Sequence, residues 1–165
     1  SIENYLETFN KLKEINSKIE FSSDFIIAYP GEENRDFEDT VNLIKKVKFI
    51  NSYSYIFSPR PGTVSENLNL IDKKTSFERL EIIQNELFEN QIQKNKSLEN
   101  SIVEVLVENF TEDKTKTFGR SKHMTSVIFD GKKSDIGKIV QVKISKSNRS
   151  TLFGEIVENS NQKVA

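Results

Sequence analysis

The chain opens with apolar residues at helical spacing and continues with a short apolar run. Residues 2–17 carry an apolar side chain every three or four positions, which predicts an amphipathic helix. Residues 21–29 then contain the uninterrupted run Phe25–Ala28, and such a run is typical of a strand covered on both faces, as in a parallel sheet. Pro30 and Gly31 follow at once and end the predicted strand.

A second helix and a second strand are predicted next. Apolar residues recur on one face of residues 34–48, and this segment begins with acids and ends with lysines, as the helix dipole favours. Residues 49–57 are rich in aromatic and β-branched side chains, which favours a strand. Helix, strand, helix, strand is half of a repeating β/α architecture and is too little to close a sheet by itself. Residues 1–75 are therefore predicted to be part of an α/β domain that looks truncated at its start.

The second half of the chain changes from helical to strand periodicity. Asp72 is a candidate N-cap of a long helix that runs to about Leu98, and residues 76–97 are interpreted as a connecting helix. Five short alternating segments with glycines between them follow over residues 98–165, which is typical of a small OB-like barrel. The inward face of the helix is expected to carry Phe77, Leu80, Ile83, Leu87 and Phe88. The strands are expected at residues 102–107, 115–120, 125–129, 138–144 and 151–157.

Composition excludes much catalytic chemistry. The 165 residues contain no cysteine, which excludes disulfides, thiolate zinc sites, cysteine nucleophiles and cysteine-held iron–sulfur clusters within the chain. His123 is the single histidine, so a histidine metal site or a Ser-His-Asp triad is hard to build. No apolar run approaches the length of a bilayer span and no secretory signal opens the sequence, so a cytoplasmic location is expected.

Charge is unevenly distributed along the chain, although the formal net charge is −1. Between Lys116 and Arg149, nine lysines or arginines are interspersed with two acids, Asp130 and Asp135. Basic clustering of this kind favours a polyanionic partner for the C-terminal segment. A solvated lysine-rich surface would explain the same charges.

Two predicted strand ends are candidate ligand sites, because ligands of α/β folds bind where strands end and turns begin. After the first strand, Gly31 would let the backbone approach a ligand, and the next helix supplies unpaired N–H groups. After the second strand, two prolines and Gly62 fix the backbone around Arg60, which could grip a carboxylate or phosphate. The alternatives are an ordinary strand-to-helix turn and a rigid loop with a solvated arginine.

The same two turns carry a resemblance to a known family. A hydrophobic strand followed by Tyr29-Pro30-Gly31-Glu32 resembles the Phe-Pro-Gly-Glu stretch of radical-SAM methylthiotransferases, with Ala28 where this family usually has glycine. Residues 53–63 closely resemble the sixth-strand signature of the tRNA branch of the family, and they differ from the branch that modifies a ribosomal protein. The helix around Glu78-Arg79-Leu80 resembles the family's connecting helix, and the resemblance runs in the right order over residues 5–158.

This resemblance implies that residues 1–75 are the last β/α units of an incomplete radical-SAM β/α barrel. In this family the strand before the Pro-Gly turn supports the adenine of S-adenosylmethionine, largely through backbone contacts. The residues that become candidate cofactor contacts are Tyr29, Pro30, Gly31, Glu32, Ser58 and Arg60.

The basic C-terminal segment carries a further resemblance. Phe118-Gly119-Arg120-Ser121-Lys122 resembles the Gly-Arg turn of the TRAM domain that ends these enzymes, with His123 and Met124 where an asparagine is often found. In such a turn cations neutralise RNA phosphates, and Phe118 is either a stacking face or part of the barrel core. Lys146 and Arg149 are expected in a loop that extends the basic surface. The candidate RNA contacts are Lys116, Phe118, Arg120, Lys122, Lys146 and Arg149.

The resemblance also implies a function, a tRNA-modifying transferase that methylthiolates C2 of isopentenyladenosine next to the anticodon. The family uses S-adenosylmethionine and two 4Fe-4S clusters, each held by three cysteines of an N-terminal region. The expected partners are therefore the tRNA anticodon stem-loop and those missing N-terminal domains, with no membrane. Because this chain has no cysteine, no catalytic residue or metal ligand is assigned, and the chain alone is expected to be inactive. The alternatives are a sibling enzyme that acts on threonylcarbamoyladenosine and a non-catalytic RNA-binding protein.

Overall fold

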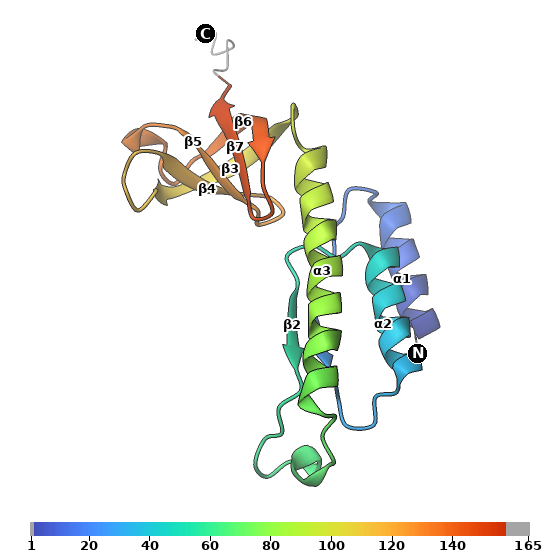
Figure 1. The fold of residues 1–165 in the computed structure, drawn as a ribbon. Coiled ribbons are helices and arrows are strands. Elements are labelled where there is room, and N and C mark those ends of the chain that lie inside the picture. The colour runs from blue at the N-terminus through green and yellow to red at the C-terminus, as the bar shows by residue number, and fades with distance from the viewer. Residues whose placement is uncertain (1, 158–165) are drawn as a thin grey trace. The chain divides into compact units, whose positions relative to one another are not determined.

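The fold consists of two compact units. The computed structural model describes residues 2–157, and the chain divides into one unit that ends at Asn90 and one that begins at Gln91 (Figure 1). Within the described residues, none of the helices combines the length and the apolar character that a membrane crossing requires.

The first unit is built from helices and two parallel strands. Its helices are α1 (Ile2–Ile15), α2 (Asn34–Val47) and the first part of α3 (Lys73–Ser97), with a short 3-10 turn, η1 (Val64–Asn67). The strands β1 (Asp24–Ile27) and β2 (Tyr53–Ile56) pair in parallel, with Asp24 opposite Tyr53 and Ile27 opposite Ile56. The predicted order of helix, strand, helix, strand and long helix is confirmed, and both strands are shorter than predicted.

Only one face of this two-stranded sheet is covered by described residues. Phe25 and Ile27 of β1 are buried in a core that α2 and α3 complete with Phe37, Ile44 and Ile83.

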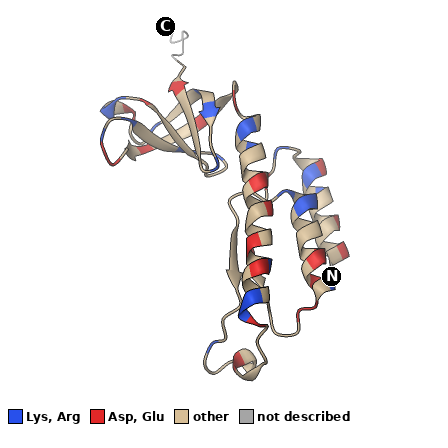
Figure 2. Ribbon diagram, viewed as in Figure 1, with Lys and Arg blue, Asp and Glu red and all other residues tan. Residues whose placement is uncertain are grey.

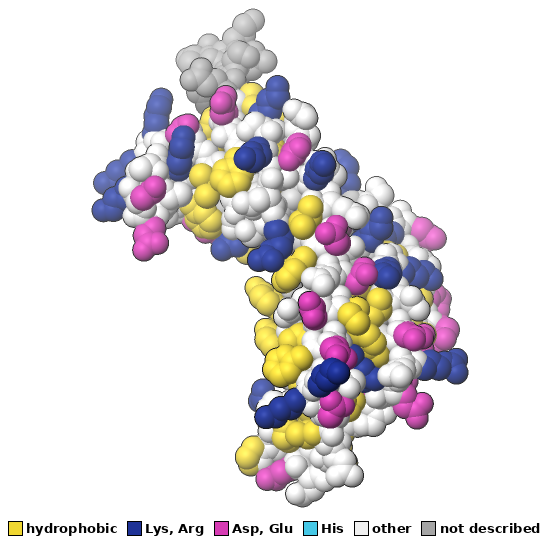
Figure 3. Space-filling view, in the orientation of Figure 1, with side chains coloured by type: hydrophobic (Ala, Val, Ile, Leu, Met, Phe, Trp, Pro, Cys, Tyr) yellow, Lys and Arg dark blue, Asp and Glu magenta, His cyan; other side chains and the backbone are white. Residues whose placement is uncertain are grey.

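The opposite face of the sheet is exposed. Ile26 is 62% exposed and is in register with Tyr55, which is 54% exposed. The expectation that the first strand is covered on both faces is therefore wrong for the described part of the chain, because all the packed helices contribute to the core on the other side. Figure 3 displays hydrophobic side chains along the β2 side of this unit.

The inward face of α3 differs from the predicted one. Ile83 and Leu87 are buried as expected, but Phe77 is 62% exposed and Phe88 is 37% exposed. The buried stripe runs instead through Arg79, at a spacing of four residues from Ile83, and through other polar side chains. The prediction was wrong for the two phenylalanines because it favoured apolar residues, whereas these polar side chains are buried with hydrogen-bond partners. Figure 2 marks the positions of lysine, arginine, aspartate and glutamate along the ribbon of α3.

The second unit is a closed five-stranded barrel. Its strands are β3 (Ile102–Phe110), β4 (Thr117–Ser121), β5 (Ser126–Asp130), β6 (Ile139–Ser147) and β7 (Thr151–Ile156), with a 3-10 turn η2 (Lys133–Asp135) before β6. They close in the order β3-β4-β5-β7-β6, in which β5 and β7 are parallel and the other neighbours antiparallel. The predicted five-stranded OB-like barrel is confirmed. Its core consists of Val105, Val107, Val127, Phe129, Val142, Ile144 and Leu152.

The end of α3 is fixed to the barrel by a buried amide. Asn95 is fully buried, and its Nδ2 donates to the carbonyl oxygens of Asn148 and Arg149, both at 2.9 Å. Gln91 Nε2 donates to Asn95 Oδ1 at 3.0 Å, which orients the amide. The last turns of the helix thus satisfy the backbone of the turn between β6 and β7, a role that an apolar side chain cannot fill.

Candidate functional site

The turn after β1 has a strained backbone and an internal carboxylate. Ala28 has a φ of +56°, in the left-handed region that glycine adopts without strain, and Gly31 has a φ of +90°. The Ala28 N–H donates to Glu32 Oε2 at 2.9 Å, and the Glu32 N–H donates to the Tyr29 carbonyl at 2.9 Å. The position where the resembled family has glycine is therefore one whose geometry favours glycine.

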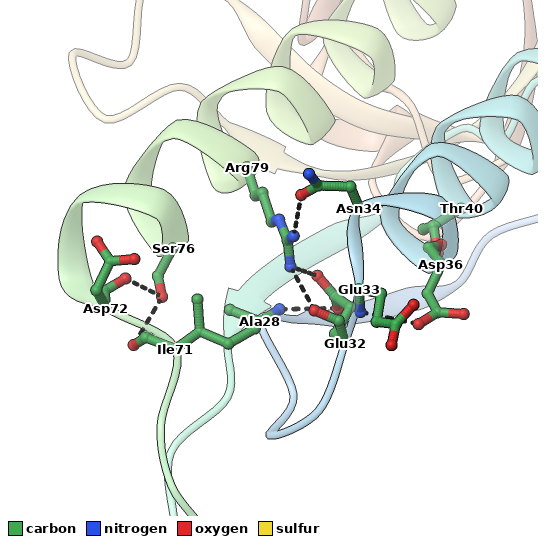
Figure 4. A network of polar contacts seen from close by, with 10 residues as sticks. All are labelled: Ala28, Glu32, Glu33, Asn34, Asp36, Thr40, Ile71, Asp72, Ser76 and Arg79. Atoms are coloured by element: carbon green, nitrogen blue, oxygen red, sulfur yellow. Dashed lines mark hydrogen bonds and ion pairs between the residues drawn. The ribbon is translucent and has the colours of Figure 1, made fainter.

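Arg79 of α3 extends toward this turn and contacts Glu32 and Asn34 (Figure 4). Its Nη1 lies 2.6 Å from Glu32 Oε1 and also donates to the Glu32 carbonyl at 3.1 Å. Its Nη2 donates to Asn34 Oδ1 at 2.8 Å, and its guanidinium lies 5.3 Å from the centroid of the Phe37 ring. The Arg79 and Glu32 side chains are only 8% and 13% exposed, so this is an almost fully buried ion pair with hydrogen bonds on both partners.

The carboxylate of Glu32 is thus engaged inside the protein. One oxygen accepts from Ala28 and the other from Arg79, so both carboxylate oxygens have partners within the first unit. Tyr29, by contrast, is 47% exposed and packs edge-on against Phe57, with ring centroids 4.8 Å apart. The sequence predicted Glu32 as a cofactor contact and Arg79 only as part of the connecting helix. The spacing of four residues between Arg79, Ile83 and Leu87 was the signal that Arg79 faces inward.

The second predicted turn lies at the same end of the sheet as the first. Phe57 donates its N–H to the Ile27 carbonyl at 2.8 Å, which extends the pairing of β1 and β2 to the point where both turns begin. The loop that follows contains Ser58 and Arg60, both exposed. The Arg60 carbonyl accepts from Thr63 Oγ1 at 2.7 Å, so the backbone around Arg60 is fixed while its side chain is exposed.

On the barrel, Phe118 and Arg120 share the outer face of β4. The alternate residues Thr117, Gly119 and Ser121 are buried, and Phe118 is only partly buried and lies outside the core cluster. The alternative that Phe118 belongs to the barrel core is therefore excluded. The Arg120 guanidinium lies 5.3 Å from the Phe118 ring centroid, a cation–π arrangement.

Gly119 is required by the closeness of the neighbouring strand. A Cβ at this position would overlap the Leu106 carbonyl oxygen of β3. The glycine of the predicted Gly-Arg turn thus permits close strand packing inside the barrel, with Arg120 directed outward beside it.

The remaining candidate cations differ in their surroundings. Lys116 is in an ion pair with both carboxylate oxygens of Asp130, at 2.7 Å each, which reduces the charge it offers to a ligand. Lys122 is exposed after the end of β4. Lys146 lies within β6, opposite Phe153, so its assignment to a loop was wrong, because β6 extends past a bulge that follows Ile144. Arg149 lies in the turn between β6 and β7, as predicted.

The described residues offer no conventional metal site. No group of three or more histidine, aspartate or glutamate side chains is placed to hold a metal ion in residues 2–157, and the sequence contains no cysteine. The pKa values of Asp72 and Asp113 are lowered, chiefly by hydrogen bonds from neighbouring threonine hydroxyl groups. Asp72 accepts the Thr75 N–H at 3.0 Å, which confirms it as the N-terminal cap of α3.

The barrel and the whole chain each resemble known proteins. Residues 96–157 match the family model described as the TRAM domain, which covers β3 to β7. The matched segment lies within the C-terminal unit, in line with the resemblance of the Gly-Arg segment.

Over its whole length the chain is similar to proteins named tRNA-2-methylthio-N(6)-dimethylallyladenosine synthase. The protein of this name from Pelagibacter ubique is 63% identical over 165 residues, which is 100% of this chain and 37% of the relative. Those from Ruthia magnifica and Rickettsia akari are 38% and 40% identical over 93% and 94% of this chain, each match covering 35% of the relative. The chain therefore spans little more than a third of the length of these relatives.

Proposed function

We propose that this chain is the C-terminal part of a radical-SAM tRNA methylthiotransferase that methylthiolates C2 of isopentenyladenosine next to the anticodon. The observation that carries the proposal is the 63% identity over the whole chain to the Pelagibacter ubique protein named tRNA-2-methylthio-N(6)-dimethylallyladenosine synthase. The TRAM match at residues 96–157 supports the same assignment independently of the first unit.

In this proposal the first unit forms the wall of a barrel that holds S-adenosylmethionine. Two parallel strands with helices on one face are what a β/α barrel wall requires, and the uncovered face with Ile26 and Tyr55 would then point into the barrel. Further strands would come from residues outside this chain and would pair with the open edges of β1 and β2.

The residues at the ends of β1 and β2 are suited to contact S-adenosylmethionine. Tyr29, Pro30 and Gly31 at one strand end, with Ser58 and Arg60 at the next, are the candidate contacts to S-adenosylmethionine, which supplies the radical and the methyl group when bound. We assign Glu32 the supporting role, because its carboxylate is bound to Ala28 and Arg79. Iron–sulfur clusters do not fit these residues, because thiolate ligands are absent from the sequence. The two 4Fe-4S clusters would be held by N-terminal domains of the same protein, and this chain alone would be inactive.

The second unit would bind the tRNA anticodon stem-loop. Arg120, Lys122 and Lys146 are outward cations on the barrel or beside it, and counterion release from phosphates would make binding dependent on salt. A protein with this function works on tRNA in the cytoplasm, and nothing in the described helices suggests a membrane span.

An assay with two proteins tests the proposed function. The parent protein and the 165-residue chain are each incubated with unmodified isopentenyladenosine-containing tRNA, S-adenosylmethionine, a sulfur source and reductant, and the tRNA nucleosides are measured by mass spectrometry. The parent is expected to form the methylthio nucleoside and the chain alone to form none. A parent protein that binds tRNA but leaves it unmodified would favour a non-catalytic RNA-binding protein instead.

A further inference from the structure

A row of apolar side chains crosses the outer face of the barrel. Phe118 of β4 pairs with Ile128 of β5, and Ile128 pairs with Phe153 of β7. Phe153 in turn pairs with Lys146 of β6. Side chains alternate along a strand, and neighbours such as Val127 are fully buried, so Phe118, Ile128 and Phe153 face outward. We call these three residues the apolar row.

The two rows beside the apolar row have different chemistry. On one side Lys116 and Asp130 neutralise each other. On the other side Arg120 pairs with Ser126, and Ser126 pairs with Thr151. The side chains of Ser126 and Thr151 are small, so on this side only Arg120, next to Phe118, is bulky.

Cations stand at both ends of the apolar row. The Arg120 guanidinium lies 5.3 Å from the Phe118 ring centroid and forms a longer, partly exposed ion pair with Glu108, with an Nε–Oε2 distance of 3.7 Å. Lys146 is the exposed partner of Phe153. Figure 3 shows hydrophobic side chains gathered on the visible face of the barrel, with lysine and arginine side chains around them. Flat apolar rings bordered by cations complement nucleotides, which present flat bases beside phosphates. A purely apolar protein partner would have no use for the two cations.

We propose that the apolar row stacks two unpaired RNA bases, one on Phe118 and one on Phe153, while Arg120 and Lys146 neutralise the phosphates beside them. The proposal rests on the proposed RNA-binding function and specifies which part of the RNA the barrel contacts. Neighbouring strands are about 4.8 Å apart, so rings on β4 and β7 are separated by about 10 Å, with Ile128 between them. Bases in a paired stem are stacked on one another and cannot open onto such a surface, so the barrel binds loop nucleotides.

The test compares three RNAs with the full 165-residue chain and its variants. Fluorescence anisotropy measures the affinity for an anticodon stem-loop, for an unstructured single strand and for a blunt duplex, each at several salt concentrations. Phe153→Ala is expected to weaken binding of the first two about tenfold without changing the salt slope, because stacking contributes no counterion release. Phe153→Tyr keeps a flat ring and is expected to bind as the unaltered chain does.

Arg120→Ala is expected to weaken binding and to reduce the salt slope by about 0.7 on the single strand.

A matched control variant and the duplex RNA separate failure of the stacking proposal from failure of the proposed RNA-binding function. Ile139, which is 69% exposed at the opposite end of β6 from Lys146, can be changed to alanine without effect on any of the three RNAs. Unchanged single-strand affinity of Phe153→Ala, with Arg120→Ala still weakened, overturns the apolar row but leaves the RNA-binding function standing. An equal loss for the duplex also overturns it, because stacking on unpaired bases predicts no such loss. Absence of salt-dependent binding by the unaltered chain overturns the proposed RNA-binding function itself.

Discussion

Arg79 and Glu32 are 47 positions apart in sequence and form a buried ion pair with an Nη1–Oε1 distance of 2.6 Å. Glu32 uses its other carboxylate oxygen to accept the Ala28 N–H, so a residue of the long helix α3 fixes the turn that follows β1. The candidate cofactor turn is therefore stabilised by contacts within the first unit. Its conformation depends on packing between α3 and the turn after β1, which lie far apart in sequence and which hydrophobic periodicity predicts one at a time.

Loss of the Arg79 side chain should destabilise the first unit strongly. Arg79→Ala leaves the Glu32 carboxylate buried without its partner, and breaking such a pair typically costs about 3–5 kcal/mol. Urea unfolding of the full chain measures the effect. Lys74→Ala is the control, since the Lys74–Glu78 pair is exposed and should contribute little. Unfolding midpoints that agree between Arg79→Ala and the unaltered chain would contradict the role given to the pair.

Ala28→Gly should stabilise the chain. The left-handed φ of +56° costs a residue with a Cβ about 1–2 kcal/mol, and the greater freedom of glycine when unfolded offsets about 0.5–1 kcal/mol of the gain. A rise in the melting temperature by calorimetry is the expected result. Gly31→Ala, at a φ of +90°, should lower it, and a fall for both variants would show that strain at Ala28 is not relieved by glycine.

Asn95→Ala should destabilise the barrel unit. Its Nδ2 donates to two backbone carbonyls from a fully buried position, and the loss of a hydrogen bond typically costs about 0.5–1.5 kcal/mol. Hydrogen exchange of the amides in β6 and β7 should accelerate more than that of β1 and β2. Ser97→Ala, an exposed change two positions away, serves as the control. Equal acceleration of amide exchange in Asn95→Ala and Ser97→Ala would contradict the stabilising role assigned to Asn95.

The cap at Asp72 gives a pH-dependent prediction. Hydrogen bonds from Thr75 lower the pKa of the Asp72 carboxyl, so its ionised form is favoured when the chain is folded. Its contribution is therefore present above the pKa of the unfolded chain and is lost as pH falls through the lower folded value. The difference in melting temperature between the unaltered chain and Asp72→Ala should be largest near neutral pH and should shrink in acid. A difference independent of pH would indicate that the charge of the cap is irrelevant.

Local sequence patterns predicted the helices and strands well, but they predicted less well which side chains are exposed. The apolar run at Phe25 and Ile27 identified β1, but Ile26 is exposed, because a strand's second face depends on what packs there and not on the strand itself. The spacing to Ile83 and Leu87 indicated that Arg79 faces inward, but its ion pair could not be predicted because the partner, Glu32, lies far away in sequence.

Local sequence patterns also could not predict which strands pair, because the partners lie far apart in sequence. The Gly-Arg turn indicated Phe118 and Arg120, but Phe153 joins Phe118 only through the parallel pairing of β5 with β7. Non-consecutive pairing of this kind is set by closure of the barrel, so neither Phe153 nor the strand position of Lys146 could be read from the segment alone.

The composition of modified nucleosides in tRNA from cells that lack the parent gene tests the central claim most directly. The account predicts that 2-methylthio-isopentenyladenosine disappears while isopentenyladenosine accumulates, and that a plasmid copy of the parent gene restores the methylthio group. An unchanged level of that nucleoside would contradict the account. Loss of the methylthio group from threonylcarbamoyladenosine instead would contradict the assigned substrate and identify the sibling activity.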